Sequence, residues 1–282
     1  MVTFSGGEQL PALGLGTWRM GEASARRGAE VAAVRAALEM GWRVIDTAEM
    51  YGEGGAEKIV GTAVGEALRA GGLTRDELFV VSKVYPQNAS AKGTLAACER
   101  SQARLGLDHI DCYLLHWRGA VPLAETVAAF STLRERGRIR HWGVSNFDLD
   151  DMHELLSVDG GDRCATNQIY FSLGARGPAF DLVPWQQARG IVTMAYSPID
   201  QGDLAHSTEL QAMAGQRGCT AAQLALAWLT AQPGVMAIPK AGNETHLHEN
   251  LGSTELVLTA ADQAAIDAIF PAPREKTPLA MR

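Results

Sequence analysis

Eight short apolar runs alternate with helical patterns along this chain of 282 residues, and that alternation predicts a (β/α)8 barrel. A polar or aromatic residue stands at the end of each run, as expected where parallel strands end at one shared face. The length suits a barrel that forms a single domain over residues 1–282. A doubly wound sheet is the alternative fold, because it is built from the same alternating units.

The first ten residues have the pattern of a β-hairpin that precedes the barrel. Its strands are expected at residues 2–5 and 8–10, on either side of Gly6-Gly7, a pair that suits a two-residue turn. The next strand, at residues 13–18, contains glycines whose spacing differs from GxGxxG. This difference argues against a Rossmann turn at the start of the main fold.

The remaining strand and helix patterns alternate at similar spacing. Short runs rich in β-branched residues predict strands at 44–47, 78–83, 110–115, 141–146, 165–169, 191–196 and 235–240. Apolar residues three or four apart predict helices at 31–38, 59–68, 95–105, 123–130, 149–156, 182–189, 221–229 and 260–270.

The composition is typical of a soluble globular protein. The chain is 46% hydrophobic and 20% charged, and no window approaches the ~20 apolar residues of a membrane span. Its net charge of −7, without a block of like charge, argues against a nucleic-acid surface. The four cysteines are far apart and the N-terminus lacks the apolar core of a signal peptide, so we expect a cytoplasmic protein with reduced thiols.

Chemically useful side chains gather at the predicted C-terminal strand ends, which form the active face of a barrel. In strand order they are Trp18, Asp46 with Tyr51, Lys83, His116, Ser145-Asn146, Gln168, Tyr196 and Lys240. The opposite strand ends carry mostly glycine and arginine, with no comparable set. We therefore expect the functional site on the C-terminal face.

Asp46, Tyr51, Lys83 and His116 form a combination suited to proton transfer. A phenol has an ordinary pKa of about 10 and needs a nearby cation to act as an acid near neutral pH. Lys83 ends the strand beside that of Asp46 and is expected to reach both Asp46 and Tyr51, while His116 can donate a hydrogen bond or pass a proton. Each residue alone has a structural explanation, but their places on successive strands favour a functional one.

Eight segments, in the same order, resemble the aldo-keto reductase superfamily. They are LPALGLGTW, GWRVIDTAEMYG, SKV at 82–84, LDHIDCYLLHW, GRIRHWGVSNFD, NQIYFSL, MAYSPIDQG and IPKAGN. The chain looks nearest to bacterial members that reduce assorted aldehydes. The resemblance implies an NADPH-dependent oxidoreductase that reduces aldehydes or ketones to alcohols, with Asp46, Tyr51, Lys83 and His116 as the catalytic tetrad and Tyr51 as the general acid.

The resemblance also implies a nicotinamide site. Tyr196 would stack on the nicotinamide ring, while Ser145, Asn146 and Gln168 would hold its carboxamide. Asp46 resembles the residue that meets the nicotinamide ribose, and Glu249 and Asn250 resemble the pair that meets adenine. The other implied cofactor residues are Thr17, Trp18, Ser197, Ile199, Gly202, Lys240, Ala241, Asn243 and His246.

Two positions of the expected phosphate site depart from the family pattern. Ala241 stands where many members have serine, and His246 stands where many have the arginine that binds the 2′-phosphate of NADP. A neutral histidine lacks the fixed bidentate charge of arginine. Lys240, Asn243 and the N-terminus of the following helix still suit a phosphate. We therefore expect NADPH as the cofactor, with NADH as the other candidate.

The substrate side is expected to have an apolar wall with few polar groups. Its expected members are Trp18, Met50, Tyr51, His116, Trp117 and Phe147. Arg118 replaces the proline of the family's His-Trp-Pro, either to attract acidic substrates or as a solvated rim group. The short tail after residue 270 predicts an open mouth and broad aldehyde use, including dicarbonyls.

Two other functions remain open. Lys83 could form a Schiff base, although Asp46 should keep its amine charged. The chain could also be a non-catalytic nicotinamide-binding subunit, since a fold does not prove turnover. We expect no metal, because His246 and His248 should point apart on a helix. Members of the superfamily are commonly monomeric, so we expect a monomer that acts on a small carbonyl compound, without a nucleic-acid or membrane partner.

Overall fold

The computed structural model describes residues 1–282 and contains eight parallel strands that follow one another in chain order around a barrel. The strands are β3 (Leu15–Gly16), β4 (Val44–Asp46), β5 (Phe79–Val84), β6 (Ile110–Leu115), β7 (Ile139–Ser145), β8 (Thr166–Tyr170), β9 (Val192–Tyr196) and β10 (Val235–Ala237). The first and last strands meet through parallel bridges, with the amides of Gly14 and Gly16 donating to the carbonyls of Ala237 and Pro239. This arrangement confirms the predicted barrel rather than a doubly wound sheet.

An antiparallel hairpin of β1 (Val2–Thr3) and β2 (Gln9–Leu10) confirms the prediction for the N-terminus. The paired strands are shorter than predicted, and the loop between them contains both glycines of Gly6-Gly7, at φ 103° and 87°. Phe4 in this loop is buried, with its ring centroid 4.9 Å from that of Phe79. The hairpin therefore packs against the N-terminal end of the barrel strand at Phe79–Val84.

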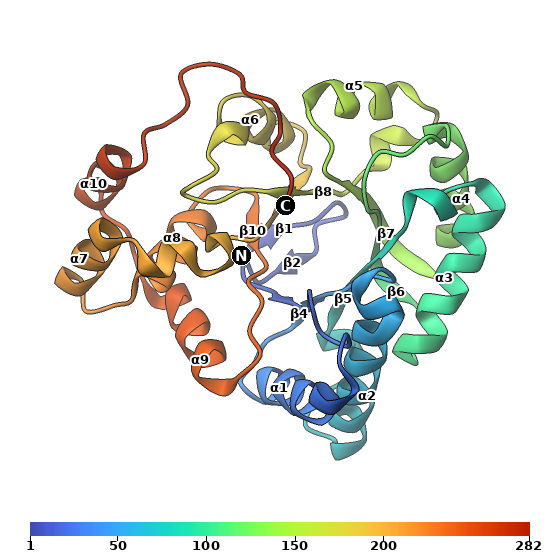
Figure 1. Cartoon of the computed structure of the whole chain (residues 1–282). Helices are drawn as coiled ribbons and strands as arrows, with labels where there is room; N and C mark the ends of the chain where they lie inside the picture. Colours follow the sequence, from blue (N-terminus) through green and yellow to red (C-terminus); the bar gives the residue numbers. More distant parts are fainter.

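Ten helices surround the strands as a ring (Figure 1). They are α1 (Arg27–Glu39), α2 (Gly55–Ala70), α3 (Ala91–Leu105), α4 (Leu123–Glu135), α5 (Leu149–Ser157), α6 (Leu182–Gln187), α7 (Thr208–Gln216), α8 (Ala221–Thr230), α9 (Glu244–Gly252) and α10 (Ala260–Ile269). The apolar pattern did not predict α7, which buries only Leu210 and Ala214. None of the ten helices has the length and apolar character required to cross a bilayer.

The predicted first and last strands are longer than β3 and β10. These two strands are joined by single bridges rather than by a continuous ladder, so residues 17–18 and 238–239 lie outside the strands and Lys240 forms an isolated bridge with Gly16. The two segments approach closely, because a Cβ atom at Gly16 would lie 2.7 Å from the carbonyl oxygen of Ile238. A side chain at this position would disturb the closure of the barrel.

The C-terminal tail runs from α10 back to the centre of the barrel mouth (Figure 1). Lys276 lies 3.5 Å from the Asp150 carboxylate, and the backbone amide of Arg282 donates to the Tyr196 hydroxyl at 3.2 Å. The guanidinium of Arg282 lies 5.1 Å from the centre of the Tyr170 ring. The short tail is therefore long enough to reach the mouth, which the prediction of an open mouth did not include.

Candidate active site

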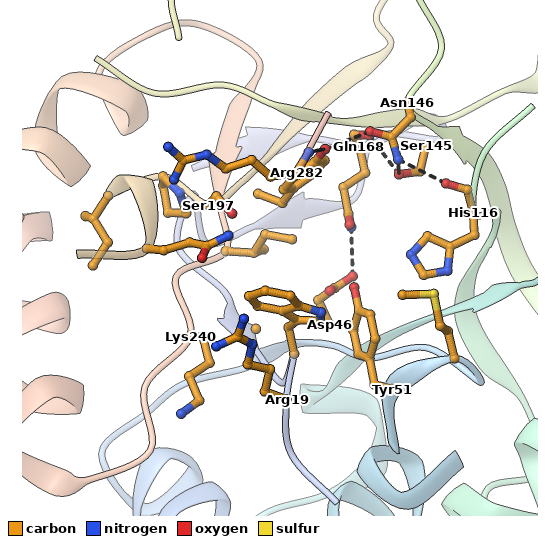
Figure 2. A pocket seen from close by; sticks show the side chains of 18 of the residues that line it. Arg19, Asp46, Tyr51, His116, Ser145, Asn146, Gln168, Ser197, Lys240 and Arg282 are labelled. Atoms are coloured by element: carbon orange, nitrogen blue, oxygen red, sulfur yellow. Dashed lines mark hydrogen bonds between the residues drawn. The ribbon is translucent and has the colours of Figure 1, made fainter. Parts of the chain in front are cut away.

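A cavity of about 400 Å³ opens among the loops at the C-terminal strand ends (Figure 2). It is lined by residues that follow most of the barrel strands, as the placement of the polar residues in the sequence predicted. The predicted site residues that line it are Trp18, Asp46, Met50, Tyr51, His116, Ser145, Asn146, Gln168, Tyr196, Ser197, Ile199, Gly202, Lys240 and His246.

A buried ion pair supports one wall of this cavity. The Lys83 side chain is fully buried, and its Nζ donates to both carboxylate oxygens of Asp46 at 2.8 Å and to the Thr47 carbonyl at 2.9 Å. It also donates to the Tyr51 hydroxyl at 3.1 Å. Because β4 and β5 are neighbours, with Asp46 opposite Val81, Lys83 can reach back to all three residues.

A tight turn after β4 brings Tyr51 over this ion pair. Tyr51 begins a short 3-10 segment, Tyr51–Gly54, in which Gly52 has a φ of 56°. A Cβ atom at Gly52 would lie 2.7 Å from the carbonyl carbon of Gly21. Glycine is therefore required for this close turn, and the turn places the Tyr51 hydroxyl between Lys83 and the cavity.

Burial keeps Tyr51 in its protonated form. Burial of the hydroxyl, and then the nearby Asp46 carboxylate, raise the pKa of Tyr51 well above its ordinary value. Burial likewise lowers the pKa of Lys83, and the Asp46 carboxylate opposes that change. The expected lowering of the Tyr51 pKa by Lys83 is not found, because burial of the hydroxyl dominates and the Asp46 carboxylate raises the pKa further. Tyr51 is thus a phenol near neutral pH and can donate its proton.

His116 is a neutral ring beside Tyr51. The two ring centroids are 5.7 Å apart in an edge-to-face arrangement, and both residues line the cavity. Burial, and then the charge of Lys83, lower the pKa of His116 well below its ordinary value. The site therefore offers two uncharged hydrogen-bonding groups next to each other (Figure 2).

The side-chain amides of Gln168 and Asn146 are held by hydrogen bonds to other residues of the site. Gln168 Nε2 donates to Asp46 Oδ1 at 2.7 Å, so this amide helps to orient the carboxylate. Asn146 Nδ2 donates to the His116 carbonyl at 3.2 Å, and Asn146 Oδ1 accepts from the Tyr196 hydroxyl at 2.8 Å. Asn146 has a φ of 60°, a strained conformation of the kind found at functional sites.

Four basic residues line the same cavity, namely Arg19, Lys240, His246 and Arg282. The sequence reasoning missed two of them. Arg19 directly follows Trp18 at a strand end, a position that could have identified it, and its guanidinium lies 4.3 Å from the Trp18 ring centroid. Nothing in the sequence around Arg282 indicated a role in the site, because only the folded tail brings this residue to the mouth. Cations gathered in one cavity of an acidic chain suit an anionic ligand.

Several predicted cofactor residues lie outside the cavity lining. Thr17 is fully buried and donates through Oγ1 to the Asp46 carbonyl at 2.9 Å, so it supports the site from behind. Ala241 is buried, and Asn243 caps α9 by accepting from the His246 amide at 2.8 Å. Glu249 and Asn250 lie on α9, and neither side chain lines the cavity.

Two predicted members of the substrate wall also lie elsewhere. Phe147 is fully buried in the core, because the positive φ of Asn146 turns the chain and Asn167 Nδ2 donates to the Phe147 carbonyl at 2.8 Å. Trp117 packs behind His116, with ring centroids 5.0 Å apart. The prediction for Phe147 is corrected accordingly, and Trp117 supports the ring that lines the cavity.

The remaining charged candidates have partners or stand apart. Arg118 Nη2 donates to the Glu154 carboxylate at 2.8 Å, and Arg118 does not line the cavity. This arrangement favours the rim-group interpretation. His246 and His248 are both exposed on α9, and no group of three histidine, cysteine, aspartate or glutamate side chains could hold a metal ion.

The model of the Aldo/keto reductase family matches residues 12–270, and the chain belongs to this family. It is 48% identical to methylglyoxal reductase YeaE of Escherichia coli K12, over 100% of this chain and 98% of the relative. It is 35% identical to glyoxal reductase of Bacillus subtilis, over 95% and 92% of the two chains. An aldo-keto reductase of Klebsiella pneumoniae, solved in complex with NADPH, has a TM-score of 0.93 and 46% identity, over 100% and 98% of the chains.

Proposed function

We propose that this protein is an NADPH-dependent reductase that converts aldehydes and ketones, including small dicarbonyl compounds, into alcohols. The observation that carries the proposal is the Tyr51 hydroxyl, which lines the cavity while lying 3.1 Å from the buried Lys83 ammonium. The similarity to proteins named for methylglyoxal and glyoxal supports small dicarbonyls as the substrate class.

The cavity has groups that fit the nicotinamide and the phosphates of NADPH. Tyr196 offers an aromatic face, Ser145 and Asn146 offer polar groups for a carboxamide, and the basic residues suit phosphates. His246 stands on the first turn of α9, where helix amides also favour an anion. When bound, NADPH supplies the hydride that is transferred to the carbonyl carbon. NADH would use the same groups except those for the 2′-phosphate.

The proposed role of Tyr51 is to donate its proton to the carbonyl oxygen of the substrate. Lys83 donates to the tyrosine oxygen and so stabilises the negative charge that develops there as the proton leaves. Asp46 holds Lys83, and neutral His116 donates a hydrogen bond that orients the carbonyl. A Schiff base at Lys83 is disfavoured, because its amine is engaged by Asp46, Thr47 and Tyr51 and does not line the cavity.

The test is the loss of NADPH absorbance, and then of NADH absorbance, with a panel of aromatic, aliphatic and dicarbonyl aldehydes. We expect aldehyde-dependent oxidation that is faster with NADPH than with NADH. Tight cofactor binding without oxidation would instead favour the non-catalytic nicotinamide-binding subunit. The tetrad and the cavity come from one chain, and we propose that the enzyme works as a monomer in the cytoplasm.

A further inference from the structure

The segment that carries Tyr51 has an unfavourable backbone conformation. Gly52, Glu53 and Gly54 all have positive φ angles, of 56°, 53° and 83°. For a residue with a side chain, such as Glu53, this left-handed region is unfavourable. A strained conformation persists only where surrounding contacts hold it. The contacts of this segment therefore contribute to the position of the Tyr51 hydroxyl.

Arg104 on α3 contacts the segment on both sides of Tyr51. Its Nε donates to Glu57 Oε2, and its Nη2 lies 3.9 Å from Glu49 Oε2. Its aliphatic stem lies against Gly54, where a Cβ atom would be only 2.6 Å from Arg104 Cδ. Glu49 precedes Tyr51 and Glu57 follows it. The Arg104 guanidinium therefore contacts the chain on both sides of Tyr51.

Glu57 also connects this segment to the strand that carries Lys83. Its Oε1 accepts from Ser82 Oγ at 2.6 Å, and Ser82 directly precedes Lys83 on β5. The Glu57, Ser82 and Lys83 side chains are all fully buried. A buried carboxylate requires its partners, because an uncompensated charge away from water is costly. Glu57 thus links the two chain segments that supply Tyr51 and Lys83.

We propose that Arg104 is a positioning residue for Tyr51, which acts through Glu57 and Glu49 to keep the tyrosine hydroxyl beside Lys83. Arg104 does not line the cavity and contacts no member of the tetrad, so its effect passes through the Tyr51 segment. Misplacement of a catalytic group by about 1 Å can cost up to about 100-fold in rate. The kinetic part of this inference rests on the proposed reductase function.

The kinetic test is Arg104→Met, which removes the guanidinium and keeps most of the stem. We expect kcat for carbonyl reduction to fall by at least about 10-fold, with the Kd for NADPH changed by less than about twofold. Arg104→Lys restores a cation near Glu57 and is expected to recover part of kcat. An unchanged kcat in folded Arg104→Met would overturn the proposal.

The matched control is Arg75→Met. Arg75 Nη2 donates to the fully buried Asp111 at 2.7 Å, and the Arg75 and Arg104 side chains are 20% and 18% exposed. Arg75 precedes β5 and lies at the opposite strand ends from Tyr51. We expect this variant to lose stability and to keep its kcat. An equal loss of kcat in both variants would indicate general loosening of the fold and would overturn the assignment.

A crystal structure of Arg104→Met tests the proposal without any activity. We expect the Tyr51 hydroxyl to lie beyond hydrogen-bond reach of Lys83 Nζ, in contrast to the 3.1 Å seen here. The same contact should persist in Arg75→Met. A retained Tyr51–Lys83 contact in Arg104→Met would refute the positioning role, whether or not the protein is a reductase. If Arg104→Met does not fold, Arg104→Gln takes its place with the same expected displacement and loss of kcat.

Discussion

At the scale of single residues, burial has the same effect on the two groups expected to meet the substrate carbonyl. It raises the pKa of Tyr51 and lowers the pKa of His116, so both side chains are held in their neutral forms. The charges lie behind them, in the Lys83–Asp46 pair. A neutral carbonyl thus meets two uncharged groups, while Lys83 is ready to stabilise the negative charge that appears on the tyrosine oxygen.

The neutral state of His116 predicts a pH dependence of stability. An unfolded chain binds a proton at this histidine below about pH 6.5, whereas the folded protein binds it only at lower pH. The stability that neutral His116 contributes is therefore fully present above about pH 6.5 and is lost as the pH falls towards the folded pKa. We expect the free energy of unfolding in urea to fall less between pH 7.5 and 5.5 in His116→Gln than in the wild type.

The difference between the two proteins should approach about 1.4 kcal/mol per pH unit at most, which is the slope for one proton. Burial also lowers the pKa of His141, but that residue is present in both proteins and cancels in the comparison. The same pH dependence in wild type and His116→Gln would show that His116 is not held neutral by folding.

The sequence alone was enough to predict those site residues that have ionisable side chains. Asp46, Lys83 and His116 stood out because ionisable groups follow apolar strands, and the structure brings them together with Tyr51. The burial of Phe147 could not be read from the sequence. It depends on the positive φ of the preceding residue, which no composition or spacing reveals.

At the scale of elements, the start of α9 carries a departure from the pattern of the family that the sequence resembles. His246 lines the cavity on the first turn of α9, and Asn243 caps the helix. The arrangement presents helix amides and an imidazole where the family resemblance implies the 2′-phosphate. The position is suited to an anion, but an imidazole lacks the fixed bidentate charge of an arginine.

We predict that His246→Arg increases the preference for NADPH over NADH. One added hydrogen bond between charged groups contributes about 1.5 kcal/mol or more, so the ratio of the two kcat/KM values should rise roughly 10-fold. The matched control is His248→Arg, which changes an exposed residue of the same helix that does not line the cavity. An unchanged ratio in His246→Arg would mean that the 2′-phosphate lies elsewhere.

The C-terminal tail is an element whose position could not be predicted from the sequence. Its path depends on contacts with distant residues, such as Lys276 with Asp150 and Arg282 with Tyr196. We predict that deletion of residues 277–282 raises KM for a small aldehyde by about fivefold, because about 1 kcal/mol of wall contact is lost. Steady-state kinetics would measure the change. An unaltered KM would contradict closure of the mouth by the tail.

At the scale of the whole molecule, the fold explains why a protein with a net charge of −7 has a cavity lined by several basic residues. A barrel of parallel strands brings loops from distant parts of the chain to one face. Arg19, Lys240 and Arg282 are far apart in sequence but line one cavity. The net charge argued against a broad basic surface, whereas the local concentration of cations follows only from the closed barrel.

The barrel itself could be predicted because alternating strand and helix patterns extend along most of the chain. The ends of its strands and one of its helices could not be predicted, because they depend on contacts between residues that are distant in the sequence. The first and last strands are joined by two isolated bridges, Leu13 with Ala237 and Gly16 with Lys240, rather than by a continuous ladder. Helix α7 buries too few apolar residues to give a clear stripe. Whether a segment forms a strand or a helix was therefore easier to predict than the residues at which it begins and ends.

The most direct test of the central claim compares wild type with Tyr51→Phe in the oxidation of NADPH by methylglyoxal, with NADPH binding measured on the same samples. Tyr51→Phe removes only the proton donor, so we expect the rate to fall by at least about 100-fold while the Kd for NADPH stays within about twofold. Turnover close to that of the wild type would contradict the role of Tyr51 as the acid.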